Sequence, residues 1–274
     1  NINLLLGPDK SKLLKLSEVN VEPLRLPENN ERMIPVYSET ILNEAKINQN
    51  LVVLDADLVL DTGLIEFKNK YPERFIECGI AEQDMVSQAG TMAIAGLLPV
   101  VHSFACFLTS RASEQIYNNC TEKQKIIYVG SLAGLLPSGP GHSHQAVRDV
   151  IAMSAMPGIK IIEPVNSKQV KAALEWAVRT NTSSSYLRLT SIPYENINIK
   201  NISGDLIEGR GEIASGERGD VVLVSVGPIM TEISMSIALK LQERGYAVQV
   251  ISTAWLNCID IDWYKEQLKD SKVI

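Results

Sequence analysis

Glu82 has the setting best suited to acid–base chemistry in this chain. It lies in the segment 79–85 (GIAEQDM), just after an expected strand and in the first turn of an expected helix built mostly from small or apolar residues. Ligands of open parallel sheets bind outside the carboxyl ends of the strands, so a carboxylate here would face a binding crevice. The simpler interpretation, which the local pattern alone favours, is a glutamate that stabilises the helix start through the helix dipole.

Two aromatic residues follow another expected strand. Phe104 and Phe107 belong to the segment 102–107 (HSFACF), and the chain has only four phenylalanines. Such a pair could form the face on which a planar ring stacks. Taken alone, the pair is more typical of ordinary core packing.

A glycine-rich loop carries two of the three histidines. His142 and His144 lie in the segment 137–145 (PSGPGHSHQ), and loops with paired histidines often bind ligands or move protons. The spacing could also bind a metal, but no cysteine or carboxylate cluster completes a site, so we expect no metal ligands in this chain. The third histidine, His102, is expected to be a satisfied strand residue.

Strands alternate with helices through most of the chain. The expected strands are 51–54, 75–78, 99–104, 125–129, 159–162 and 186–189; the expected helices are 35–47, 79–95, 109–120, 145–155 and 167–179, the last capped by Ser167. This alternation predicts an α/β fold with a doubly wound, mostly parallel sheet covered on both faces.

Three segments divide the chain. Residues 1–32 are irregular and are expected to form a linker or arm, whereas residues 33–200 contain the main sheet. Residues 192–219 are polar and glycine-rich and are expected to connect to a second domain, 201–274. That domain begins as a βαβ unit, and because two or three strands make a poor sheet, we expect it to be incomplete.

Composition excludes several classes of protein. The 274 residues are 45% hydrophobic, which argues against disorder, and the net charge of −6 argues against nucleic acid or an anionic membrane as partner. The apolar runs are far shorter than the roughly 20 residues of a membrane span. Residues 1–6 carry no secretory signal pattern and the four cysteines are scattered, so we expect a cytoplasmic protein with reduced thiols.

Four segments together resemble a known family. The runs ERFIECGIAEQDMVSQAGTMAIAG, HSFACF, GPGHSHQAVRDV and MPGIKIIEP resemble, in order and spacing, the pyrimidine-binding half of transketolases. The resemblance covers roughly residues 33–192, and the tail from about 207 resembles the start of the transketolase C-terminal domain. The nearest group is the C-terminal sections of two-component transketolases, which depend on thiamine diphosphate.

The resemblance implies a cofactor site. The glutamate that matches Glu82 hydrogen-bonds the aminopyrimidine ring of thiamine diphosphate and so promotes deprotonation of the thiazolium carbon. Phe104 and Phe107 match aromatic residues that flank this ring, and Ile80 is expected to contact the cofactor beside them. A third family aromatic is replaced here by Ser110.

The resemblance also implies a substrate site. His144 matches a histidine that faces the substrate and assists proton transfer, so Glu82 and His144 are the expected catalytic residues. His142 and Asp61 are expected to contact the substrate, a sugar or sugar phosphate.

Several substrate positions depart from the family pattern. Ile34 and Thr190 stand where arginines are usual, Asp61 where a serine is usual, Gly130 where a histidine is usual, and Pro140 where an acidic residue is usual. A phosphate loses its strongest ligands without guanidinium groups. We therefore expect an acceptor other than a standard pentose phosphate, or a phosphate held elsewhere.

A further motif of the family is missing from the sequence. The GDG motif and downstream Asn that bind the diphosphate and Mg²⁺ (or Ca²⁺) do not occur in this chain. The resemblance therefore implies a partner: an N-terminal-section subunit or domain that binds the metal, in a twofold dimer or an α2β2 heterotetramer.

The resemblance implies ketol transfer between sugars, a transferase reaction of carbohydrate metabolism. Two other functions stay open. One is the β-subunit of a 2-oxoacid dehydrogenase E1 component, which shares the fold and the glutamate. The other is a non-catalytic partner subunit, although a scaffold would need neither Glu82 nor His144.

Overall fold

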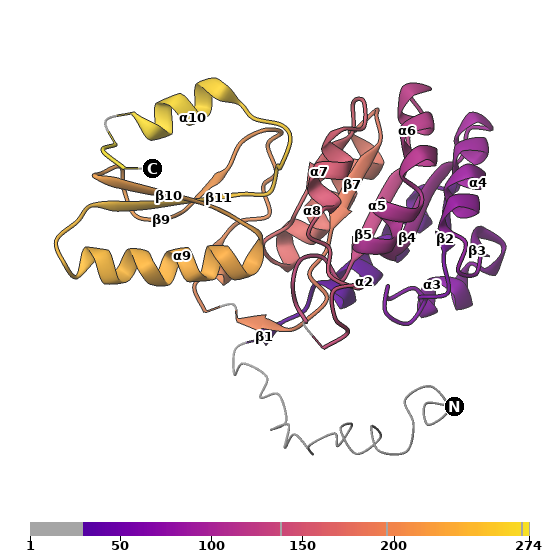
Figure 1. Cartoon of the computed structure of the whole chain (residues 1–274), viewed down its shortest axis with the longest axis horizontal. Coiled ribbons are helices and arrows are strands. Elements are labelled where there is room, and N and C mark those ends of the chain that lie inside the picture. The colour runs from indigo at the N-terminus through magenta and orange to yellow at the C-terminus, as the bar shows by residue number, and fades with distance from the viewer. Residues whose placement is uncertain (1–29, 138, 196, 270, 274) are drawn as a thin grey trace, which may run out of the picture.

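The computed structural model describes residues 30–137, 139–195, 197–269 and 271–273. Most of the expected arm, residues 1–29, lies outside the described residues. The first described residues form β1 (Asn30–Glu31), which pairs antiparallel with β8 (Tyr194–Glu195). The chain therefore enters the fold beside the segment that leaves the main sheet (Figure 1).

The main sheet has six strands, and every neighbouring pair is parallel. In spatial order they are β3 (Phe75–Glu77), β2 (Leu51–Asp55), β4 (Leu98–Phe104), β5 (Ile127–Ser131), β7 (Ser185–Arg188) and β6 (Lys160–Ile162). The predicted doubly wound parallel sheet is confirmed.

Helices cover both faces of this sheet because successive strand residues point to opposite sides. In β2, Leu51 and Val53 join one apolar cluster, and Val52 and Leu54 join the other. The helices of the first cluster are α2 (Met33–Ile47), α3 (Ile65–Lys70) and α8 (Ser167–Arg179); those of the second are α4 (Glu82–Ile94), α5 (Ala105–Arg111), α6 (Ser113–Thr121) and α7 (Asp149–Ser154). A short 3-10 helix, η2 (Pro72–Arg74), precedes β3.

The strand order creates a crevice at one edge of the sheet. The chain runs outward from β2 to β3, then returns to β4 and continues in the other direction to β5. The order therefore reverses between β2 and β4, and ligands of open α/β sheets bind at the carboxyl ends of strands at such a reversal. All the residues expected to carry chemistry lie at, or follow, the carboxyl ends of β3, β2, β4 and β5.

A second sheet lies beside the first and shares its core. It contains β10 (Val221–Val226) and β11 (Val248–Thr253), which are parallel, and β9 (Glu212–Ser215), which is antiparallel to β11. Helices α9 (Gly227–Gln242) and α10 (Ile261–Leu268) lie on opposite sides of it (Figure 1). Trp255, after β11, packs edge-on against Trp176 of α8 with ring centroids 4.8 Å apart, so one apolar core spans both sheets.

Several local predictions need correction. Asn166, not Ser167, caps α8, because its Oδ1 accepts the Gln169 backbone N–H at 3.0 Å. The helix expected over 109–120 is two helices separated at Ala112. The expected connection 192–219 contains β8, β9 and a 3-10 helix, η3 (Ile199–Asn201).

The domain boundary near residue 200 and the incompleteness of the second domain stay predictions. The main sheet ends at Arg188 and the second begins at Glu212. In the described part of the chain, no helix has the length and apolar character that crossing a membrane requires.

Candidate active site

Glu82 is a buried carboxyl group at the mouth of a hollow. It is the first residue of α4, five positions after the end of β3, and is only 3% exposed. The hollow beside it has a volume of about 690 Å³; we call it the Glu82 hollow, and its lining residues are Ile80, Ala81, Glu82, Gln83, Asp84 and Arg111. Ile80 is 72% exposed there.

Arg111 connects Glu82 to the aromatic pair. Its Nη1 donates to Glu82 Oε1 at 2.5 Å, and its guanidinium carbon lies 3.9 Å from the centroid of the Phe107 ring. Among the described residues, no hydrogen bond reaches Glu82 Oε2. Arg111 was not predicted from the sequence: it comes from the far end of α5, 29 positions from Glu82, and no local pattern signals such a contact.

The two phenylalanines and His144 form a cluster of three rings. Phe104 ends β4 and Phe107 lies in α5, with ring centroids 5.7 Å apart. The His144 ring lies 5.0 Å from Phe107 and 6.1 Å from Phe104, edge-on to both, and its Nδ1 is 3.0 Å from Ser143 Oγ. The structure thus brings together residues from the end of β4, from α5 and from the glycine-rich loop.

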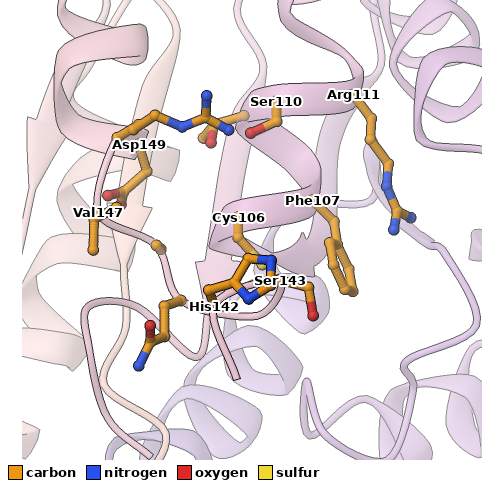
Figure 2. Close-up of a pocket in the computed structure, with 12 residues that line it drawn as sticks. Cys106, Phe107, Ser110, Arg111, His142, Ser143, Val147 and Asp149 are labelled. Carbon is orange, nitrogen blue, oxygen red and sulfur yellow. The ribbon is translucent and has the colours of Figure 1, made fainter. Parts of the chain in front are cut away.

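His142 lies at a second hollow, on the other side of Arg111. This His142 hollow has a volume of about 300 Å³ and lies between α5 and the loop that precedes α7. Figure 2 shows Phe107 and Arg111 projecting side by side from α5, next to His142 and Ser143 of the loop. Because Arg111 lines both hollows, Glu82 and the histidine loop belong to one continuous surface.

Asp61 lies at a third hollow on the other side of the aromatic cluster. This Asp61 hollow has a volume of about 300 Å³, and its lining residues are Arg32, Ile34, Pro35, Leu60, Asp61, Phe104, Leu132, Ser191 and Ile192. Phe104 is the residue that connects it to the ring cluster. Of the two positions where the family has arginines, Ile34 lines this hollow, whereas Thr190 is buried and lines a different one between the two sheets.

Steric crowding explains the glycine at position 130 of this chain. A Cβ at this position would lie 2.5 Å from Tyr186 Oη and 3.0 Å from the Ala105 backbone. Tyr186 is fully buried, so its ring fills the space that a side chain on β5 would need. The histidine usual in the family cannot fit here.

Asp57 is a candidate that the sequence reasoning missed. It follows β2 at the carboxyl edge of the sheet, and its φ of 62° places a non-glycine residue in the left-handed region. Its backbone N–H donates to Glu77 Oε1 at 2.8 Å, and the same oxygen accepts Gly79 N–H at 3.2 Å. Strained residues held by such contacts cluster at functional sites. The available signal was an aspartate two residues beyond a strand end.

Two other buried titratable groups lie beneath this edge, and each has partners for its polar atoms. Burial raises the pKa of Asp55 to about 6, against the opposing effect of its hydrogen bonds from Leu58 N–H (2.6 Å) and Thr62 Oγ1 (2.8 Å). Burial lowers the pKa of His102 to about 4. The ring nitrogens of His102 lie 2.5 Å from Tyr37 Oη and 3.2 Å from the Leu54 carbonyl, as expected for a satisfied strand residue.

The described residues contain no group of three or more His, Cys, Asp or Glu side chains that could hold a metal ion. The arrangement at the carboxyl edge is instead an aromatic surface flanked by one buried carboxyl group and one imidazole. Such a surface can stack a flat ring, hydrogen-bond its edge and exchange a proton with a nearby ligand.

Curated relatives match most of the length of this chain. A 1-deoxy-D-xylulose-5-phosphate synthase from Rhodococcus erythropolis is 29% identical over 225 residues, which is 81% of this chain and 34% of that protein. A protein from Methanocaldococcus jannaschii, named as a transketolase C-terminal section, is 31% identical over 242 residues, 86% of this chain and 73% of that protein. The chain thus spans about a third of the length of the synthases that it matches.

Solved structures show the same fold. A split gene transketolase, solved as an inactive β4 tetramer, matches with a TM-score of 0.77 and 29% identity over 89% of this chain and 78% of its own. The transketolase from Campylobacter jejuni has a TM-score of 0.77 over 99% of this chain and 42% of its own, but at 19% identity it supports the fold alone.

The profile of one protein family matches more than half of the chain. The family is described as "Transketolase, pyrimidine binding domain", and the match covers residues 32–195. These residues contain the whole main sheet and all three hollows. The chain therefore belongs to the transketolase family, and residues 32–195 are its pyrimidine-binding domain.

Proposed function

We propose that this chain supplies the pyrimidine-binding half-site of a thiamine diphosphate-dependent enzyme that transfers a two-carbon ketol unit between sugars. The observation that carries the proposal is Glu82. The residue is only 3% exposed and borders a hollow, and one of its carboxyl oxygens accepts no hydrogen bond within the described residues. A carboxyl oxygen that accepts no hydrogen bond from the protein and borders a cavity is free to accept one from a ligand.

The Glu82 hollow and the aromatic pair, which Arg111 connects to it, fit the aminopyrimidine of thiamine diphosphate in chemical type. Phe104 and Phe107 offer flat apolar faces, and Ile80 offers an exposed apolar contact. Glu82 Oε2 is the oxygen left free to hydrogen-bond a ring nitrogen, because Arg111 contacts Oε1. When bound, thiamine diphosphate supplies the carbon nucleophile that makes and breaks the carbon–carbon bond.

The roles of the protein residues follow from their positions. Glu82 hydrogen-bonds the pyrimidine edge and exchanges a proton with it, and Arg111 keeps the carboxyl group oriented. His144 lies against the aromatic cluster on the loop side, where its imidazole can exchange a proton with a substrate hydroxyl. His142 lines the neighbouring hollow and is the proposed second substrate contact.

The remaining half of the cofactor site is assigned to a partner. The chain lacks the GDG motif, so a second chain or domain would hold the diphosphate and Mg²⁺ (or Ca²⁺), in a twofold dimer or an α2β2 heterotetramer. The match to a C-terminal section and to a split gene transketolase supports this division. A cytoplasmic location is part of the proposal, because all four cysteines are free thiols.

The Asp61 hollow indicates the substrate class. Its charged residues are Arg32, which is exposed, and Asp61, and much of its remaining lining is apolar. A phosphate dianion here would face the Asp61 carboxylate with one guanidinium to balance it, which is unfavourable. We therefore propose that the end of the sugar placed here is uncharged.

The test uses the complex of this chain with a GDG-bearing partner. We expect the complex, and not the isolated chain, to bind thiamine diphosphate by calorimetry and to transfer a ketol unit from a ketose donor. Unphosphorylated acceptors should have higher kcat/KM values than phosphorylated ones, and Asp61→Ser should shift this ratio about tenfold toward the phosphorylated acceptor. An unchanged ratio would contradict the assignment of the Asp61 hollow.

A second candidate function comes from the synthase relatives. An enzyme of that type would yield a 1-deoxyketose phosphate, whereas ketol transfer lengthens the acceptor by two carbons, so mass spectrometry of the product separates them. A complex that binds thiamine diphosphate and consumes only 2-oxoacid donors, without forming a 1-deoxyketose phosphate, would favour the 2-oxoacid dehydrogenase E1 class. A complex that binds no thiamine diphosphate would indicate a non-catalytic subunit.

A further inference from the structure

Arg188 is the centre of a buried group of charges between the histidine loop and the second sheet. It is the last residue of β7, and its side chain is 12% exposed. Its Nε donates to Asp149 Oδ2 at 2.7 Å and its Nη1 donates to Glu163 Oε1 at 2.7 Å. Tyr186 Oη donates to the same Asp149 oxygen at 2.9 Å. One guanidinium therefore balances two buried carboxylates.

On one side, Arg188 holds the end of the histidine loop. Its Nη2 donates to the Ala146 carbonyl at 3.2 Å, two residues after His144. The Ala146 N–H donates to the Gly134 carbonyl at 2.9 Å, so Ala146 is fixed from both sides. Asp149, the next partner of Arg188, is the first residue of α7. The loop that carries His144 thus ends on two successive contacts with one arginine.

On the other side, Arg188 meets the second sheet through Glu163. The Glu163 N–H donates to the Ala254 carbonyl at 2.8 Å. A Cβ on Gly227, the first residue of α9, would lie 2.5 Å from Glu163 Oε1, so α9 begins directly against this carboxylate. Arg188 and Glu163 also line a hollow of about 450 Å³ between residues 133–136 and the start of α9.

We propose that Arg188 is a positioning residue: it holds the loop that carries His142 and His144 in place and couples that loop to the start of α9. Breaking a buried ion pair on one side leaves an uncompensated charge, so the arrangement favours a single loop conformation. Catalytic side chains need supporting contacts of this kind, because an imidazole on an unsupported loop is misplaced too often to move a proton efficiently.

Amide hydrogen exchange in the purified chain tests the proposal without any assay of activity. Arg188→Lys keeps the charge but cannot make all three contacts. We expect exchange in residues 142–148 and in 227–233 to rise at least tenfold, with residues 98–104 of the core unchanged. Asp149→Asn, an isosteric change, should raise exchange in residues 142–148 in the same way. It tests the same contact if the Arg188 variant fails to fold.

Glu163→Gln separates the two sides of the contact. It leaves the Ala146 and Asp149 contacts of Arg188 in place, so we expect faster exchange in 227–233 only. Glu44→Gln is the matched control, since Glu44 is also a buried glutamate paired with an arginine, far from the loop. It should leave the exchange of both segments unchanged relative to that of residues 98–104. A uniform rise across the whole chain in the Arg188 and Asp149 variants, or no change in 142–148, would overturn the proposal.

The expected effect of Arg188 on catalysis rests on the proposed function. In the complex with its partner, we expect Arg188→Lys to lower kcat at least tenfold with less than a twofold change in the donor KM, and Glu163→Gln to have a smaller effect. If the wild-type complex transfers no ketol unit, the proposed function fails while the exchange data still decide the positioning role. An unchanged kcat in an active complex whose loop has loosened would show that the loop contact does not serve the reaction.

Discussion

Two buried glutamates in this chain pair with arginines on opposite faces of the main sheet. Glu82, at the start of α4, pairs with Arg111, and Glu44, in α2, pairs with Arg179 of α8. The side chains of the two glutamates are 4% and 0% exposed, and those of the arginines 42% and 49%. By burial and charge alone, the two pairs are equivalent.

The difference lies in the second carboxylate oxygen. Arg179 contacts both oxygens of Glu44, with Nε donating to Oε2 at 3.0 Å and Nη2 donating to Oε1. Arg111 contacts only Oε1 of Glu82, and the other side of that carboxyl group borders the Glu82 hollow. A glutamate with both oxygens paired is structural, whereas one with a free oxygen beside a cavity is available for a ligand.

Activity should give the largest contrast between the two pairs. We expect Glu82→Gln to lower ketol transfer by the complex by at least about a thousandfold, because an amide cannot exchange the proton that the carboxyl group handles. The measurement is the initial rate with a ketose donor and saturating thiamine diphosphate.

Glu44→Gln is the matched control for that experiment. It alters the same chemical group at the same depth, and its kcat should stay within about twofold of wild type. A large loss of activity in both variants would mean that burial of the pair, rather than the free oxygen, explains the result.

The loss of stability should rank the two variants in the opposite order to the loss of activity. Glu44→Gln disrupts a fully paired buried carboxylate and should lower the free energy of unfolding by about 1.5–2 kcal/mol, because the charged partner left behind, Arg179, is half exposed. Glu82→Gln should change it by less than about 1 kcal/mol, because only one of its oxygens contributes a contact. Urea unfolding of the isolated chain measures both, and an equal loss in the two variants would contradict the distinction.

Asp55 sharpens the comparison, because it lies at the carboxyl edge and yet has both oxygens paired. Its pKa in the folded state is raised to about 6, mainly by burial. Its contribution to stability is therefore complete below the unfolded pKa near 4 and is lost as the pH rises through about 6. Asp55→Asn has no such loss. Between pH 4 and pH 6.5, its free energy of unfolding should therefore rise relative to that of wild type by roughly 2–3 kcal/mol.

His102 provides the control of opposite sign. Its folded pKa is lowered to about 4 by burial, so its contribution is complete above about 6.5 and is lost as the pH falls through 4. In the wild type, the opposite pH dependences of Asp55 and His102 nearly cancel in the free energy of unfolding, so His102→Gln should show the Asp55 effect alone.

We expect the kcat of Asp55→Asn to stay within a few-fold of wild type. A loss as large as that of Glu82→Gln would place Asp55 in the catalytic machinery.

Much of the main sheet could be predicted because its signals are local. Runs such as residues 51–54 are apolar on both faces, as strands buried between two layers of helices require. Position after a strand end then placed Glu82, Phe104 and His144 at one edge before any contact was known. The cap of α8 and the break at Ala112 were missed because Asn166 and Ser167 are both good caps and Ala112 favours helix.

The parts of the site that could not be predicted depend on contacts distant in sequence. Arg111 reaches Glu82 only because α5 packs beside α4, and Arg188 meets Glu163 and Asp149 only in the assembled sheet. Periodicity and motif spacing carry no information about such pairs. The family resemblance did not reveal them either, because it was carried by residues expected to contact the ligand.

The tight contact at Gly130 limits how this site can be redesigned or can diverge. With Tyr186 in place, any side chain at position 130 would push against the start of α5, the helix that carries both Phe107 and Arg111. A single substitution of Gly130 by the histidine of other family members would therefore displace α5, and with it Phe107 and Arg111, so the new imidazole would come at the expense of the existing site. Positions 130 and 186 must change together, so grafting the usual sugar-phosphate contacts onto this chain has to begin with a smaller residue in place of the tyrosine.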